Sequence, residues 1–171
     1  MPEEITSKEI PGTMETVGVL IFNETNDKAL LVKHTKAAQN EEGIYGIPAG
    51  QIEIALSESP KEATLRELME ETGLVAREED LEQFENNFFG TSIIRTKTGE
   101  LKPAHMRVYH CKAYEGELRN DRKTIPEWVE IDTINKWAEE DKDKELWEKK
   151  KLMPNVDIAI HNYLESQKTK T

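Results

Sequence analysis

Three glutamates in one predicted helix are the residues whose types and spacing point most directly to chemistry. Glu67 precedes Glu70 by three positions and Glu71 by four, so a helix brings the three carboxylates onto adjacent turns. Like charges at these spacings destabilise a helix by about 0.2–0.5 kcal/mol per pair, and carboxylates near the C-terminus oppose the helix dipole. The cluster therefore needs a compensating cation. Three carboxylates offer the oxygen ligands that Mg²⁺ or Mn²⁺ prefers.

The helix that carries these glutamates has clear start and stop signals. Ser59 is the expected N-cap, Pro60 suits the first helical position, and Glu62 completes a capping box. Gly73 is the expected C-terminal stop. Together these residues predict a helix over about 60–72.

The predicted helix has an apolar side and a charged side. Leu65, Leu68 and Met69 fall on one side, together with Thr72, and this side is expected to face the core. The three glutamates and Arg66 fall on the other side. A solvated charged surface is the ordinary interpretation of such a side, but here no lysine lies one turn away to relieve the repulsion. The charge balance therefore favours a cation site.

The residues around this helix form a longer spaced motif. Residues 48–50 read PAG, and a glycine there lets backbone atoms come close to a bound ion. Glu58 follows, and residues 66–74 read RELMEETGL. This pattern resembles the Nudix box, and every fixed position from Glu58 to Leu74 matches it: a glutamate, seven residues, then Arg-Glu-apolar-x-Glu-Glu-x-Gly-apolar. The box has five residues between its glycine and the glutamate, whereas seven (QIEIALS) follow Gly50 here, which we interpret as a two-residue loop insertion.

The resemblance implies a role for each of these residues. The three clustered glutamates would be ligands of Mg²⁺, with Mn²⁺ as the alternative ion, and the carbonyl oxygen of Gly50 is a further candidate ligand. Glu67 is also a candidate base for the attacking water. Arg66 would orient Glu67, and Glu58 would pair with Arg66 and so fix the helix to its loop. The predicted catalytic residues are Glu67, Arg66, Glu70 and Glu71.

Residues outside the motif leave several alternatives open. Some members of the family use a further glutamate, and Glu115, Glu117 and Glu127 are the alternatives here, each otherwise an ordinary surface residue. The four histidines show no metal-ligand spacing, and His105 and His110 are expected on opposite faces of a strand. Aromatic residues could stack a base, although core packing is the stronger expectation for each: Tyr45, Phe88, Phe89 and Trp128.

The resemblance also implies an activity. Members of the family generally use a divalent metal and water to cleave the pyrophosphate bond of a nucleoside diphosphate linked to a group X. We therefore expect a Mg²⁺-dependent hydrolase with an ADP-ribose-like, nucleoside-diphosphate-sugar-like or nucleoside triphosphate substrate. A non-catalytic nucleotide-binding sensor of the same fold is the alternative, although such a module would be expected to lose box carboxylates. An isomerase of prenyl diphosphates would need a catalytic cysteine, and Cys111 is not placed for that role.

Composition limits the classes of partner. The chain has 171 residues, of which 36% are hydrophobic and 33% charged, and a net charge of −11. We therefore expect no nucleic-acid partner, because binding through a basic surface does not suit this charge, and cations should mediate the binding of a small nucleotide. A single cysteine excludes an intrachain disulfide, and no apolar run approaches the roughly 20 residues of a membrane span. We expect a cytoplasmic protein without a signal peptide or a membrane partner, and a homodimer stays open.

Strands and further helices are expected around the glutamate helix. Apolar and alternating stretches predict strands or strand-like pieces over 14–23, 28–35, 43–50, 84–96, 105–114 and 127–132. The stretches 84–96 and 105–114 are expected to form a long hairpin, with the turn KTGE at 97–100 after the first. Helices are expected over about 133–140, 143–152 and 155–166. This order predicts an α/β fold, and its similarity to Nudix hydrolases implies an α/β/α sandwich with a mixed β-sheet. We expect one domain over 1–171, with an N-terminal arm at 1–13 and a frayed tail at 167–171.

Overall fold

The computed structural model describes residues 14–37, 42–83, 89–95, 101–144, 151–153 and 156–168, and side chains are described for these residues except 89–95 and 101–104. Its strands are β1 (Met14–Leu20), β2 (Lys28–His34), β3 (Tyr45–Gly46), β4 (Ala49–Gln51), β5 (Leu81–Glu82), β6 (Phe89–Arg95), β7 (Leu101–Cys111) and β8 (Thr124–Glu130). Its α-helices are α1 (Pro60–Thr72), α2 (Ile131–Asp141) and α3 (Val156–Lys168), and two 3-10 turns are η1 (Ile54–Leu56) and η2 (Glu78–Asp80).

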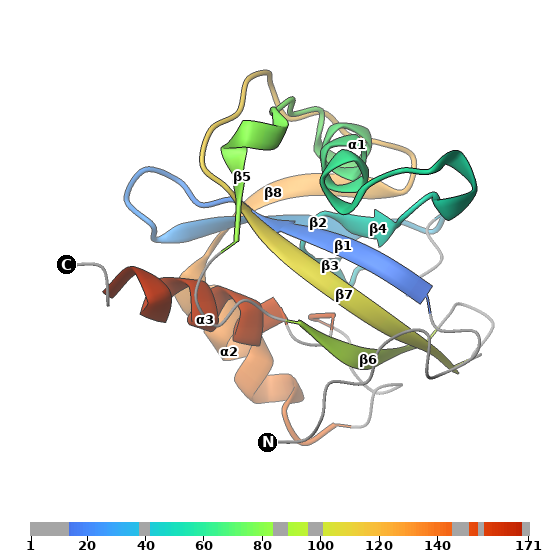
Figure 1. The fold of residues 1–171 in the computed structure, drawn as a ribbon. Coiled ribbons are helices and arrows are strands. Elements are labelled where there is room, and N and C mark those ends of the chain that lie inside the picture. The colour runs from blue at the N-terminus through green and yellow to red at the C-terminus, as the bar shows by residue number, and fades with distance from the viewer. Residues whose placement is uncertain are drawn as a thin grey trace.

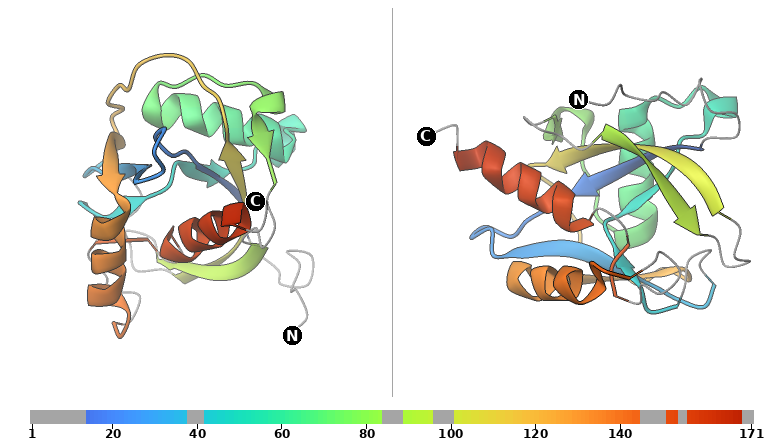
Figure 2. Two further views of the ribbon diagram at one scale, coloured as in Figure 1. Left: turned by 90° about the vertical axis from the view of Figure 1, so that its left-hand side faces the viewer. Right: turned by 90° about the horizontal axis from the view of Figure 1, so that it is seen from below.

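The strands form two sheets that lie between helical layers. One sheet has the order β4-β1-β7-β5, with β6 also paired to β7, and it is mixed because β1 and β7 run parallel. The other sheet has the order β3-β2-β8 and is antiparallel. Helix α1 lies on one side of the strands, and α2 and α3 lie on the other (Figure 1), as two further views also show (Figure 2). The predicted α/β fold with a mixed sheet is confirmed.

The core is divided by the strands into two apolar clusters. Strand β1 and the residues after it are buried on both faces, which explains the almost continuous apolar sequence there. Val19 and Ile21 pack in the cluster under α1, together with Leu68 of that helix. Leu20 and Phe22 alternate with them and pack in the cluster against α2 and α3. The alternation fixes which side of β1 and its neighbours faces the glutamate helix.

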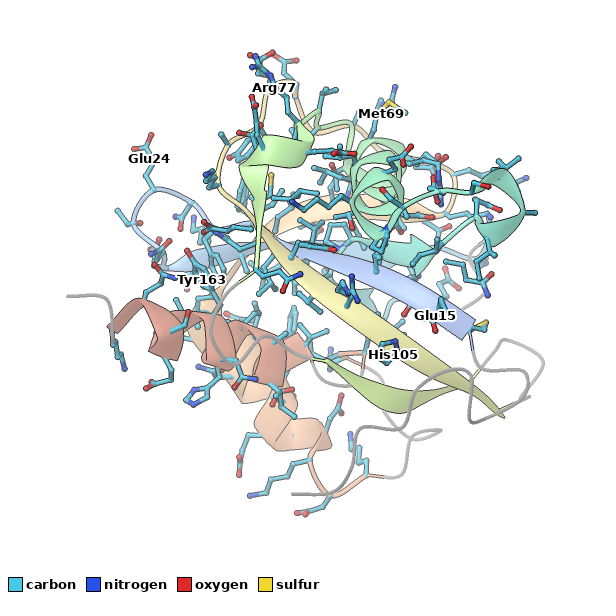
Figure 3. All side chains as sticks on the ribbon, in the orientation of Figure 1. Glu15, Glu24, Met69, Arg77, His105 and Tyr163 are labelled. Atoms are coloured by element: carbon cyan, nitrogen blue, oxygen red, sulfur yellow. The ribbon has the colours of Figure 1, made fainter. Side chains whose placement is uncertain are left out.

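Several predicted boundaries need correction. Met69 was expected in the core, yet its residue is 43% exposed and its side chain projects from α1 away from the sheets (Figure 3). The predicted helix over 143–152 is not found in the parts of it that the structure describes, because 143–144 form a turn and Leu152 bridges to Tyr45. The last strand ends at Glu130, so α2 begins two residues earlier than predicted.

The N-terminal arm and the frayed C-terminal tail were predicted at the two ends of the chain. Residues 1–13 and 169–171 lie outside the described residues, as does the predicted hairpin turn over 97–100. Helix α3 continues through Lys168, so 167 and 168 are helical rather than part of a frayed tail. Within the described ranges, no helix is long and apolar enough to cross a membrane.

Candidate active site

Helix α1 begins and ends as its sequence predicts. The Ser59 hydroxyl accepts a hydrogen bond from the backbone N–H of Glu62 at 3.1 Å, and Oε1 of Glu62 accepts one from the N–H of Ser59 at 3.2 Å. Pro60 occupies the first turn, where its missing N–H costs nothing. Gly73 ends the helix with φ of 86°, a left-handed conformation that favours glycine. These local signals position the glutamates.

The C-terminal end of α1 is stabilised by a segment far away in the sequence. The Thr124 hydroxyl donates to the carbonyl oxygen of Glu71 at 3.0 Å, and the N–H of Arg119 donates to that of Thr72 at 2.9 Å. The Arg119 guanidinium also donates to the carbonyl oxygen of Met69 at 3.3 Å. These donors satisfy carbonyl groups that a helix end leaves free, and the guanidinium adds positive charge at the negative end of the dipole.

Arg66 connects the helix to the loop that precedes it. Its Nε and Nη2 donate to the two carboxylate oxygens of Glu58 at 2.7 and 3.0 Å, which is a bidentate ion pair. Nη2 also donates to the carbonyl oxygen of Gln51 at 2.9 Å. These hydrogen bonds lower the pKa of Glu58 below its ordinary value and raise that of Arg66. The predicted pairing of Glu58 with Arg66 is therefore present in the structure.

Glu67 lies against strand β4 at Gly50. Its Oε1 accepts a hydrogen bond from Nη1 of Arg66 at 2.8 Å, and its side chain is 14% exposed. A Cβ atom on Gly50 would lie 2.1 Å from both Cδ and Oε1 of Glu67, so only a glycine allows this approach. Burial raises the pKa of Glu67, and the hydrogen bond from Arg66 opposes that shift.

Glu71 is the carboxylate held most tightly by the backbone. Its Oε1 accepts a hydrogen bond from the N–H of Ala49 at 2.6 Å. Burial raises its pKa to about 8 despite that hydrogen bond, and the negative charges of Glu67, Asp121 and Glu70 add to the shift. Burial and these neighbouring charges therefore destabilise the ionised form of Glu71.

Glu70 completes the cluster at its solvent side. Its side chain is 50% exposed, and its Oε2 lies 3.3 Å from Nη1 of Arg66. Glu67 and Glu70 thus share the Arg66 guanidinium, and Glu71 lies near enough to both for their charges to raise its pKa. Among the described residues, no group of three or more His, Cys, Asp or Glu side chains is already arranged to hold a metal ion. Carboxylate oxygens are nevertheless the ligands that suit a hard divalent cation, so the residue types at the site fit one.

The three candidate glutamates outside the motif lie in two different places, the loop after β7 and strand β8. Glu115 and Glu117 are exposed in the loop after β7, which lies against the segment Gly73–Val75 through the Glu115–Val75 backbone bridge. Glu127 accepts a hydrogen bond from the Tyr45 hydroxyl at 2.5 Å. The next residue along β8, Trp128, packs under α1, so the Glu127 side chain faces the opposite side of the sheet.

Asp121 is an acidic residue near the site that the sequence analysis did not identify. Its negative charge contributes to the raised pKa of Glu71. It lies in the loop before β8, three residues before the Thr124 that contacts the end of α1. No spacing in the sequence signals this proximity, because 50 residues separate Asp121 from Glu71.

The aromatic and histidine residues have structural contacts. Trp128 packs at the cluster under α1, and the ring of Tyr45 lies 4.9 Å from that of Trp137. Phe88 lies outside the described residues, and for Phe89 only the backbone is described. His105 contacts Glu15 at 3.0 Å (Figure 3), and His110 contacts Glu82 at 2.7 Å and the Tyr163 ring at 4.2 Å between centroids.

The carboxylate and arginine side chains of α1, together with the mixed sheet on which this helix packs, identify the class of protein. The NUDIX domain family model matches residues 12–154. The chain belongs to this family and is a Nudix pyrophosphohydrolase. A comparison with curated protein sequences found no match.

Solved structures with the same fold agree with the family assignment. The MutT NUDIX hydrolase from Burkholderia pseudomallei is 25% identical with a TM-score of 0.57, and the match covers 88% of this chain and 97% of that one. The E. coli ORF135 protein is 18% identical with a TM-score of 0.61, covering 92% and 93% of the two chains. The NUDIX domain of Shewanella oneidensis NrtR, complexed with ADP-ribose, is 18% identical with a TM-score of 0.61, covering 98% and 94%.

Proposed function

We propose that this enzyme requires a divalent cation, Mg²⁺ first and Mn²⁺ as the alternative, held by the glutamates of α1. The observation that carries the proposal is the placement of Glu67 and Glu71 together in partly buried positions, with raised pKa values. A cation would relieve the repulsion that the helix otherwise retains. When bound, the ion neutralises charge on a diphosphate and lowers the pKa of a bound water.

The protein groups around the ion have separate roles in this proposal. Glu67, Glu70 and Glu71 would hold the ion, together with the carbonyl oxygen of Gly50. Arg66 binds Oε1 of Glu67, and Oε2 has no hydrogen bond among the described residues. Oε2 is therefore the atom that would accept the proton of the attacking water, because the hydrogen bond from Arg66 fixes its position. Glu58 keeps Arg66 in place through the bidentate pair.

Glu70 is suited to exchange its partner when an ion enters. Its contact with Arg66 is 3.3 Å long and half-exposed, so the contact contributes little to stability. Glu71, by contrast, is fixed by the backbone N–H of Ala49. Glu70 would therefore be the ligand that turns toward an ion, whereas Glu71 would keep its backbone contact and α1 its place.

The substrate proposed for this site is a nucleoside diphosphate linked to a group X, cleaved at its pyrophosphate bond. The ADP-ribose complex of the NrtR NUDIX domain supports a nucleotide-derived ligand for this fold. A sensor module without activity is the rival function. The retention of all three glutamates, together with the Arg66–Glu58 pair, favours hydrolysis over sensing.

A product assay tests the proposal. Purified protein is incubated with ADP-ribose, nucleoside diphosphate sugars, dinucleoside polyphosphates and nucleoside triphosphates, with and without Mg²⁺, and the products are separated by chromatography. We expect a nucleoside monophosphate and a phosphorylated partner to form from at least one compound, only when metal is present. Equal turnover after chelation would overturn the metal requirement, and binding without turnover across Mg²⁺ and Mn²⁺ would favour the sensor.

A further inference from the structure

A group of basic side chains lies beside the acidic site, in a chain whose net charge is −11. Residues 119–123 read RNDRK, so three of these five positions are basic and one is acidic. We call Arg119, Arg122, Lys123 and the neighbouring Lys36 the basic rim. Glutamate and aspartate outnumber lysine and arginine 34 to 23 in the whole chain, so this local excess of positive charge runs against the composition.

Backbone contacts fix the basic rim at one end of α1. The carbonyl oxygen of Lys123 accepts a hydrogen bond from the N–H of Thr35 at 2.9 Å, and that of Arg122 accepts one from the Thr35 hydroxyl at 2.5 Å. The N–H of Asp121 donates to the carbonyl oxygen of Thr124 at 2.9 Å, which closes a tight turn. The Thr124 hydroxyl then contacts the carbonyl oxygen of Glu71. The rim is therefore held between the end of β2 and the end of the glutamate helix.

Backbone groups and two threonine hydroxyls make the contacts that hold this turn, and Arg122 and Lys123 contribute only backbone atoms to them. Lys36, Arg119, Arg122 and Lys123 are all exposed. Arg119 donates one hydrogen bond to the end of α1, but within the described ranges no acidic side chain pairs with Arg122 or Lys123. Asp121, between them, lies near enough to Glu71 to affect its pKa. The charges of Arg122 and Lys123 are thus exposed on a turn whose Thr124 contacts the end of the glutamate helix, and no ion pair with a described acidic residue neutralises them.

We propose that the basic rim binds phosphate groups of the substrate that extend beyond the diphosphate at the glutamates. This inference rests on the proposed function and names its substrate class: a nucleotide with a chain of three or more phosphates. A diphosphate linked to a neutral sugar has no charge to place at the rim. A longer phosphate chain would otherwise be repelled by an acidic protein, and the rim offsets this repulsion locally.

Binding of inorganic phosphate chains tests the rim without requiring turnover. Calorimetric titration with Mg²⁺ compares tripolyphosphate with pyrophosphate, using the wild type and the Arg122→Gln/Lys123→Gln double variant. We expect tripolyphosphate to bind the wild type about tenfold more tightly than pyrophosphate, because two exposed ion pairs contribute roughly that factor together. The double variant should lose this advantage while its pyrophosphate affinity stays within about twofold, as small-anion binding at the glutamates remains.

Two matched variants control for net charge and for folding. Lys142→Gln/Lys168→Gln removes the same total charge at the C-terminal ends of α2 and α3, on the other side of the sheets, where each lysine makes an exposed pair, and should keep the advantage. Arg122→Lys/Lys123→Arg keeps both charges and should keep it as well. Equal affinity of the two anions for the wild type, or an unchanged preference in the double glutamine variant, overturns the proposal.

Turnover separates this inference from the proposed function. We expect the double glutamine variant to raise KM for a dinucleoside tetraphosphate about tenfold, with kcat and the KM for ADP-ribose changed less than about twofold. Metal-dependent turnover that is equal in both proteins would refute the rim and leave the hydrolase standing. Selective tripolyphosphate binding without any turnover would support the rim and count against the hydrolase.

Discussion

Replacing Gly50 by alanine tests the contact on which the catalytic cluster depends. The new Cβ would lie 2.1 Å from Cδ and Oε1 of Glu67 and 2.6 Å from Oε2, so the carboxylate must move. Gly50 does not have a positive φ, so its own backbone accepts alanine without strain. The substitution therefore acts through Glu67, whose displacement breaks the 2.8 Å hydrogen bond from Arg66.

The expected magnitudes follow from what Glu67 loses. A hydrogen bond between charged groups contributes about 1.5–3 kcal/mol, and the displaced carboxylate regains part of this by reaching water. We expect the free energy of unfolding to fall by about 1–2 kcal/mol, which lowers Tm by roughly 2–8 °C for a chain of this size. Misplacing a catalytic group by about 1 Å costs on the order of 100-fold in rate, so kcat/KM should fall by at least that factor.

Thermal unfolding and product formation measure these two losses separately. A second pair of proteins, Glu67→Ala with and without Gly50→Ala, provides the control, because alanine at position 67 removes the clash. In that background Gly50→Ala should change neither Tm nor the residual rate by a measurable amount. Near-wild-type kcat/KM in Gly50→Ala, or an equal further loss in the Glu67→Ala background, would refute this account of the contact.

Three further substitutions test the remaining contacts. Arg66→Lys loses the bidentate pair, so urea unfolding should show a loss of about 1–3 kcal/mol and the product assay a lower kcat. Without metal, the free energy of unfolding of the wild type should fall as pH rises from about 4.5 towards 8. The reason is the raised pKa of Glu71, because the folded protein binds a proton in this range that the unfolded chain does not bind. Glu71→Gln should flatten this pH dependence and abolish metal-dependent turnover. Thr124→Val removes the hydrogen bond to the Glu71 carbonyl oxygen and should lower the free energy of unfolding by about 1 kcal/mol, whereas an unchanged urea midpoint would show that water replaces the hydroxyl.

The sequence predicted those features of α1 that depend on interactions between residues close together in the chain. Ser59, Glu62 and Gly73 lie within one turn of the groups they cap, so the bounds of α1 could be predicted from residue types alone. The spacing of the glutamates likewise needs only the period of a helix. Met69 was predicted wrongly because a helical wheel gives the direction of a side chain but not whether another element covers it.

Contacts across long sequence distances could not be predicted in the same way. Thr124 and Arg119 donate hydrogen bonds to carbonyl oxygens at the end of α1 from about 50 residues away in the sequence. Asp121 raises the pKa of Glu71 across a similar separation. Neither relation leaves a periodic pattern in the sequence. Part of the compensation for the negative charge at the helix end comes from the Arg119 guanidinium, and the cation that this charge predicts stays a prediction.

The inserted loop shows how this site tolerates a change in length. Arg66 binds the carbonyl oxygen of Gln51 at 2.9 Å, and Glu58 binds the N–H of Glu53 at 3.0 Å, so one ion pair fixes both the end of β4 and the start of the loop. The loop forms the 3-10 turn η1 beyond these contacts, where Ile54 and Leu56 are 68% and 78% exposed. If the loop carries two extra residues, as its spacing predicts, the turn directs their length to solvent, and Gly50 keeps its place against Glu67.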